Sequence, residues 1–188
     1  MVGLEVLGTE VASMSDFNEA VQVVLRHEGG FVDSPNDPGG ATSYGVSLRW
    51  LKSKGLLEQL EEADKTQDEV LVIRELTQTQ AMGYYKAFWW DVYKYGNLNA
   101  QAVASKVFDT SVNIGPSRSH KFLQSAIGVS QDGVLGSKSF NEANALSPSM
   151  LVVKLQTLQA QYYRDLVIQN PKLQEFLKGW LARSYDRN

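Results

Sequence analysis

A single glutamate, Glu28, stands where a helical pattern gives way to glycine pairs and turn residues. The pairs are Gly29-Gly30 and Gly39-Gly40, and Asn36-Asp37-Pro38-Gly39 is turn chemistry, so the chain should fold back sharply on itself. A carboxylic acid at the end of a helix, beside a tight polar hairpin, can serve a glycosidase as its general acid. The plainer interpretation is a capped helix followed by a surface turn, in which Glu28 has no chemical role.

The whole string is long and specific, and it resembles the signature of glycoside hydrolase family 108. The resemblance is carried by Glu28-Gly29-Gly30-Phe31, by Asp33-Ser34-Pro35-Asn36-Asp37-Pro38-Gly39-Gly40-Ala41-Thr42 and by Tyr44-Gly45-Val46. Phe31 and Val46 replace the usual Tyr and Ile, which are mild departures. Members are lysozyme-like N-acetylmuramidases of phage endolysins and of bacterial lysis or secretion proteins. The resemblance implies a peptidoglycan hydrolase that cleaves the β-1,4 bond between N-acetylmuramic acid and N-acetylglucosamine, with Glu28 as the general acid.

A second catalytic group is expected to steady the developing cation or to activate water. Phage-type lysozymes place an aspartate nine residues after their glutamate and a threonine shortly beyond it. Here Asp37 stands nine residues after Glu28, and Thr42 follows Asp37 with a spacing one residue shorter than in those enzymes. The similarity therefore implies that Asp37 and Thr42 are catalytic partners. Asp33 is the competing carboxylate, placed either to contact substrate or to hold the turn.

Three classes of function remain open at this stage. The leading interpretation is a muramidase, and a lytic transglycosylase acting on the same bond becomes possible if Glu28 is the sole essential group. The second class is a non-catalytic peptidoglycan-binding module, in which Glu28 only orders the hairpin. The third is a secretion-accessory protein whose partner is another protein.

Aromatic side chains supply candidates for binding sugar. Seven of them gather in one predicted helix: Tyr84, Tyr85, Phe88, Trp89, Trp90, Tyr93 and Tyr95. Most should be core, but a pyranose ring stacks its C–H face on an exposed aromatic ring, so some members could line a sugar groove. In the second half, Asn113-Ile114-Gly115 belongs to a pattern that resembles the predicted peptidoglycan-binding region of the same family. The expected substrate-binding residues are Asp33, Tyr44, Trp89 and Asn113.

The predicted fold is mainly α, a lysozyme-like helical domain with one small β-hairpin after the first long helix. Ser15 is the expected cap of that helix, which ends near His27, and the hairpin is expected to pair 31–33 with 41–46. Further helices are predicted over 47–54, 66–76, 78–95, 102–112, 117–127, 148–170 and 173–185. We expect a single compact domain, 1–188, with a catalytic lobe over 15–98 and a helical lobe over 99–188.

Composition narrows the chemistry further. The chain of 188 residues is 43% hydrophobic, with a net charge of −3 that gives no electrostatic case for nucleic acid. The absence of cysteine excludes a cysteine peptidase, and two histidines argue against a zinc amidase. No metal and no cofactor are expected, and the expected partner is the glycan strand of bacterial peptidoglycan.

The first fifteen residues contain no Lys or Arg, and Glu5 and Glu10 interrupt them, so neither a signal peptide nor an anchor is predicted. We expect synthesis in a host cytoplasm and action on the cell wall in the periplasm after release, for which the resembling family uses a phage holin. The last predicted helix is basic and amphipathic, so contact with a membrane surface is a secondary hypothesis. The protein is expected to be a monomer.

Overall fold

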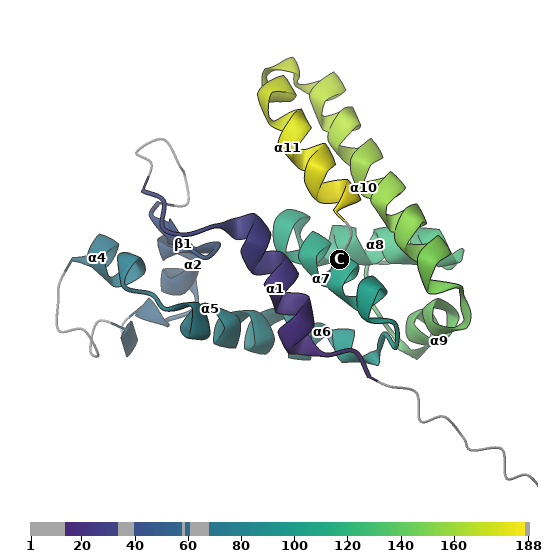
Figure 1. Ribbon diagram of the computed structural model, residues 1–188, viewed down its shortest axis with the longest axis horizontal. Coiled ribbons are helices and arrows are strands. Elements are labelled where there is room, and N and C mark those ends of the chain that lie inside the picture. Colours follow the sequence, from purple (N-terminus) through teal and green to yellow (C-terminus); the bar gives the residue numbers. More distant parts are fainter. Residues whose placement is uncertain (1–13, 34–39, 58, 61–67, 187–188) are drawn as a thin grey trace, which may run out of the picture.

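Helix α1, Phe17–Glu28, runs through the middle of the molecule and ends at the glutamate singled out above (Figure 1). Its cap is Asp16, whose side chain accepts a hydrogen bond from the Glu19 amide, and not the expected Ser15. Both residue types suit this position. The Ser15 hydroxyl instead donates to the carbonyl oxygen of Tyr95 at 3.3 Å, which ties the start of α1 to a distant part of the chain.

The computed structural model describes residues 14–33, 40–57, 59–60 and 68–186. Helices dominate it, and a two-stranded antiparallel sheet is the one sheet among the described residues. The predicted mainly α fold with one small hairpin after the first long helix is therefore confirmed.

The hairpin is shorter and tighter than expected. Strands β1, Thr42–Ser43, and β2, Val46–Ser47, pair through a turn at Tyr44 and Gly45, whose φ angles are +50° and +76°. Positive φ at both central residues is what a two-residue hairpin turn favours. The segment 31–33 contributes a single bridge, in which the backbone of Val32 exchanges two hydrogen bonds of 2.8 Å with Thr42.

A small core lies beneath this hairpin. It is built from α2 (Leu48–Ser53), α4 (Glu69–Arg74) and the start of α5 (Gln78–Tyr85). Its buried members are Ala41, Val46, Leu51, Leu57, Val72, Ile73, Leu76 and Ala81. The expected helix over 66–76 falls partly on residues outside the described ranges, and its described part is α4.

The aromatic helix predicted over 78–95 is broken into several pieces. Thr77 and Gln80 form the predicted capping box of α5. Helix α5 is followed by a π-helical turn, η1 (Lys86–Trp90), and by the short helix α6 (Asp91–Tyr93). Lys94 then adopts the left-handed conformation, and the 3₁₀ turn η2 (Tyr95–Asn97) comes after it. The extra residue of the π turn rotates the aromatic side chains relative to a regular helix. Trp90 is buried, whereas Trp89 is only partly covered.

The larger core surrounds α7, Gln101–Ile114, which packs against α1 and α8, Pro116–Ile127. Helix α9, Ser137–Ala145, closes one end. A long helical hairpin projects from this lobe (Figure 1). It consists of α10 (Pro148–Gln169), the 3₁₀ turn η3 (Pro171–Leu173) and α11 (Gln174–Tyr185). Helix α11 runs back toward the lobe, so that its end meets α7 and α1.

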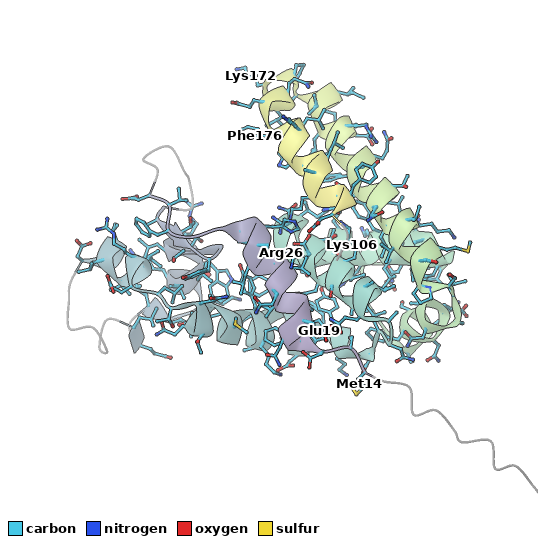
Figure 2. All side chains as sticks on the ribbon, in the orientation of Figure 1. Met14, Glu19, Arg26, Lys106, Lys172 and Phe176 are labelled. Carbon is cyan, nitrogen blue, oxygen red and sulfur yellow. The ribbon has the colours of Figure 1, made fainter. Side chains whose placement is uncertain are left out.

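Figure 2 marks the two ends of this hairpin: Lys106 lies at its base, whereas Lys172 and Phe176 lie toward its tip. Helix α11 docks on α10 through Trp180, which stacks on Tyr163 with ring centroids 5.0 Å apart. The expected apolar face of the last helix is only partly covered by this packing, because Phe176 stays 49% and Tyr185 47% exposed. Within the described ranges, no helix is both long and apolar enough to cross a membrane.

Candidate active site

Glu28 is the last residue of α1 and lies where the two cores meet. Tyr44, from the hairpin turn, packs against both cores. The turn touches the glutamate directly, because a Cβ atom added to Gly45 would lie 2.7 Å from Glu28 Cγ and 2.4 Å from the Tyr85 hydroxyl. Tyr85 donates this hydroxyl to the carbonyl oxygen of Tyr44 at 2.9 Å. The glycine motif therefore brings the backbone of the hairpin flat against Glu28, whose side chain remains 20% exposed.

The partner of the Glu28 carboxylate comes from the far end of the sequence. Arg183, in the last turn of α11, donates from Nη2 to Glu28 Oε1 at 2.7 Å. The same guanidinium grips Asp109 of α7 in a fork, Nη2 to Oδ1 at 2.8 Å and Nε to Oδ2 at 3.3 Å. Planar bidentate pairing of this kind fixes the orientation of an arginine as well as its charge. Three helices thus converge on one ion-pair network.

Two further groups extend the network toward the surface. Both ring nitrogens of His27 face a carboxylate oxygen at 3.1 Å: Nδ1 lies against Asp109 and Nε2 against Asp186. Asp186, just after α11, also lies 3.5 Å from the guanidinium of Arg26. Asp109 is 1% exposed, so its charge has little contact with water and depends on these partners.

The electrostatics of the buried members follow from their partners. Burial alone would raise the pKa of Asp109, but the hydrogen bond from His27 and the charge of Arg183 outweigh it and lower this pKa. Burial would lower the pKa of Arg183, and the carboxylates of Asp109 and Glu28 reverse that effect and raise it. Burial and the Glu28 charge raise the pKa of Tyr85, so its hydroxyl keeps its proton at neutral pH.

A second cation holds the same end of α11. Lys106 lies one helical turn before Asp109 on α7, and its ammonium donates to the carbonyl oxygens of Ser184 at 2.8 Å and of Arg183 at 3.2 Å. It is 1% exposed, and burial lowers its pKa to about 8 despite the nearby Asp109. Residues three apart on a helix share a face, so α7 binds the side chain and the main chain of α11 at one point.

The expected catalytic partners are only partly located. Asp37 lies outside the described residues, and Asp33, the last described residue before 34–39, is exposed. Thr42 begins β1 with its backbone paired to Val32, and its hydroxyl donates to the Val32 carbonyl oxygen at a long 3.5 Å. The roles of Asp37, Thr42 and Asp33 stay predictions.

The expected sugar-binding residues fall in two places. Trp89 is partly covered, with its ring centroid 5.4 Å from that of the partly covered Trp50 and 5.6 Å from that of the buried Tyr85. Tyr44 is held in the hairpin turn beside Glu28. Asn113 lies apart from both, at the end of α7, where its Oδ1 accepts the Tyr163 hydroxyl.

Asn113 and Arg183 border the same hollow. It has a volume of about 510 Å³ and is lined by His27, Asn113, Gly179, Trp180, Ala182, Arg183 and Asp186. Four of the seven lining residues are polar or charged, and the indole of Trp180 supplies an apolar wall. In the described part of the chain, no group of His, Asp and Glu side chains is arranged to hold a metal ion.

Sequence reasoning missed the contacts of Arg183, Asp109 and Lys106. Arg183 lies 155 residues from Glu28, and in sequence it looks like one basic residue of an amphipathic helix. One signal was available: Lys106 and Asp109 stand in the apolar stretch 102–112, and charged residues are rarely buried unless they are paired.

Comparison with known proteins agrees with this geometry. Residues 21–115, just over half of the chain, match the family model described as glycosyl hydrolase 108, and residues 118–185 match one described as a predicted peptidoglycan domain. The solved structure of Brucella abortus SagA is similar, with 26% identity, a TM-score of 0.62, and coverage of 90% of this chain and 96% of that chain. No curated protein matches.

The lysozyme-like helical fold and the two family matches indicate a glycoside hydrolase that acts on peptidoglycan. The chain belongs to glycosyl hydrolase family 108. The family resemblance inferred from the sequence is confirmed.

Proposed function

We propose that this protein is an N-acetylmuramidase, which hydrolyses the β-1,4 bond between N-acetylmuramic acid and N-acetylglucosamine, with Glu28 as the general acid. The observation that carries the proposal is the placement of Glu28. It ends α1, lies against the hairpin turn at Gly45 and keeps a partly exposed carboxyl. A general acid needs this combination of fixed position and access to substrate.

In the proposed reaction, the Glu28 carboxyl gives its proton to the glycosidic oxygen while positive charge builds at the sugar carbon. Glu28 becomes a carboxylate in that step, and the adjacent Arg183 guanidinium stabilises the charge it acquires. Asp37 and Thr42 are the proposed groups that steady the cation or orient water on the other side of the sugar.

We further propose that the rings of Trp50 and Trp89 form a stacking surface for a sugar. Both are partly covered rather than buried, and they lie on the elements that follow the hairpin and approach Glu28 through Tyr85. A pyranose packs its apolar face on such rings while its hydroxyls bond to polar neighbours.

The test replaces Glu28 with glutamine, which keeps the shape of the side chain and its ability to accept a hydrogen bond from Arg183. Release of reducing ends from purified sacculi should fall by about 10²–10⁴-fold, the usual contribution of a general acid. The matched control is Glu19→Gln, an exposed glutamate in the first turn of the same helix, and its rate should equal that of the wild type. A folded Glu28→Gln protein that digests sacculi at the wild-type rate would refute the assignment.

The route to the wall is a separate proposal. We propose that the protein reaches the periplasm by release from the cytoplasm, as an endolysin does, and acts there as a monomer; contact of α11 with a membrane surface stays a secondary hypothesis. In cells that make the protein in their cytoplasm, turbidity should fall only after the inner membrane is permeabilised. Lysis of such cells without permeabilisation would contradict this route.

A further inference from the structure

The last turn of α11 lies inside the catalytic site, although it belongs to the region that matches a peptidoglycan domain. Arg183 is 11% exposed and its Nη2 contacts the Glu28 carboxylate at 2.7 Å. The proposed catalytic residues come from the first half of the chain, so this contact joins the second half of the chain to the proposed site.

We propose that Arg183 is a positioning residue for the general acid, and that the second half of the chain completes the active site instead of forming a separate binding module. This inference rests on the proposed role of Glu28. Its basis is that one guanidinium spans two carboxylates, a buried one that holds it and a partly exposed one that it orients.

The fold holds the guanidinium independently of Glu28. Asp109 takes Nε and Nη2 in a fork, which leaves the second Nη2 proton for Glu28. Lys106 fixes the backbone of the same turn by donating to the carbonyl oxygens of Arg183 and Ser184. Lys106 and Asp109 therefore hold the last turn of α11 through contacts that do not involve Glu28.

The expected consequence for the reaction is electrostatic. A guanidinium at fixed distance favours the carboxylate that Glu28 becomes when it releases its proton, so it should raise the rate of the protonation step. A residue with only a structural role would not change the rate of this step at unchanged substrate binding.

Among the described residues of this network, Arg183 donates directly to the Glu28 carboxylate, whereas Asp109, His27 and Asp186 contact other members. Replacing Arg183 should therefore affect the protonation step more directly than replacing any of those three.

The experiment compares Arg183→Gln, Arg183→Lys and Glu28→Gln with the wild type, in the full-length chain. Turnover of purified sacculi is measured over a range of substrate concentrations, and binding is measured by sedimentation with the same sacculi. Arg183→Gln should lower kcat by about 10²-fold, with KM and sedimentation unchanged. The kcat of Arg183→Lys should lie between those of the wild type and Arg183→Gln, because an ammonium keeps the positive charge but cannot form the bidentate pair with Asp109.

Lys178→Gln is the matched control, since it removes one exposed positive charge from the same helix, and it should leave kcat and KM as in the wild type. Wild-type kcat in folded Arg183→Gln would overturn the inference. So would a loss of sedimentation that accounts for the whole loss of activity. If Arg183→Gln does not fold, Arg183→Lys decides: unchanged kcat overturns the inference, and lowered kcat at constant KM supports it.

Glu28→Gln separates this inference from the proposed function. An active Glu28→Gln protein would overturn both. An inactive Glu28→Gln protein together with a fully active Arg183→Gln protein would leave the general acid in place and overturn only the role of Arg183.

Discussion

Replacing Gly45 with alanine tests whether the hairpin turn holds Glu28 in place. The new methyl group would meet Glu28 Cγ at 2.7 Å, Glu28 Cβ at 2.9 Å and the Tyr85 hydroxyl at 2.4 Å, all closer than real Cβ contacts come. The residue also has φ of +76°, a conformation that costs an alanine about 1–2 kcal/mol. Overpacking adds about 1–3 kcal/mol, so the free energy of unfolding should fall by about 2–5 kcal/mol.

Activity should fall more than stability alone explains. The clash pushes Glu28 or the turn out of place, and a misplacement of about 1 Å in a catalytic group can cost about 10²-fold in rate. The assay is reducing-end release from sacculi, at a temperature where circular dichroism shows the variant fully folded. Thermal melting of the same sample gives the change in stability.

Gly55→Ala is the control for backbone strain. Gly55 has φ of +64°, and an added Cβ meets nothing within 4 Å, so this variant should lose about 1–2 kcal/mol and keep its full activity per folded molecule. If Gly45→Ala has the same melting temperature as Gly55→Ala and the two variants digest sacculi at the same rate, the close contact between the turn and Glu28 does not position the acid.

Other predictions concern the anchoring of α11. Lys106→Met removes the donor of the buried Ser184 carbonyl oxygen and leaves that of Arg183 with only the long bond from the Asp186 amide, so urea unfolding should show a loss of about 1–3 kcal/mol; an unchanged midpoint would contradict this. The pKa of Lys106 is lowered by burial to about 8 from 10.5, so the unfolded chain binds more protons between these values. The contribution of Lys106 to stability should therefore rise with pH across that window in the wild type and not in Lys106→Met. The pKa of Asp109 lies below its ordinary 3.8, so the contribution of Asp109 to the free energy of unfolding is complete above that pH and is lost as pH falls through the folded pKa. Asp109→Asn should therefore flatten the loss of stability at acid pH. An equally steep loss in the variant would contradict this role of Asp109.

Local sequence determines much of the scaffold, and the hairpin shows why. The glycines, the prolines and the helical pattern before Glu28 are local signals, so they predicted a helix that ends at the acid and a chain that turns back on it. The same signals did not give the register, because pairing within 42–47 depends on Tyr44 adopting positive φ, which is rare for a tyrosine. The capping box at Thr77 was readable because both its members lie within one turn.

The rest of the site depends on contacts that no local pattern encodes. Arg183 meets Glu28 only because α10 and α11 form a hairpin that returns to α7, a matter of packing between elements far apart in sequence. The π turn at Lys86–Trp90 likewise arises within a stretch whose composition suits a regular helix. Asp37, the partner expected from spacing, lies outside the described residues, so its role rests on the sequence resemblance.

Mass spectrometry of the fragments released from purified sacculi tests the central claim most directly. Hydrolysis by a muramidase with Glu28 as acid predicts fragments that end in reducing N-acetylmuramic acid, and none of them from Glu28→Gln. Fragments that end in reducing N-acetylglucosamine would place the cut at the other bond. Anhydro-muramic ends would show that the sugar's own hydroxyl replaces water and would contradict the proposed hydrolysis.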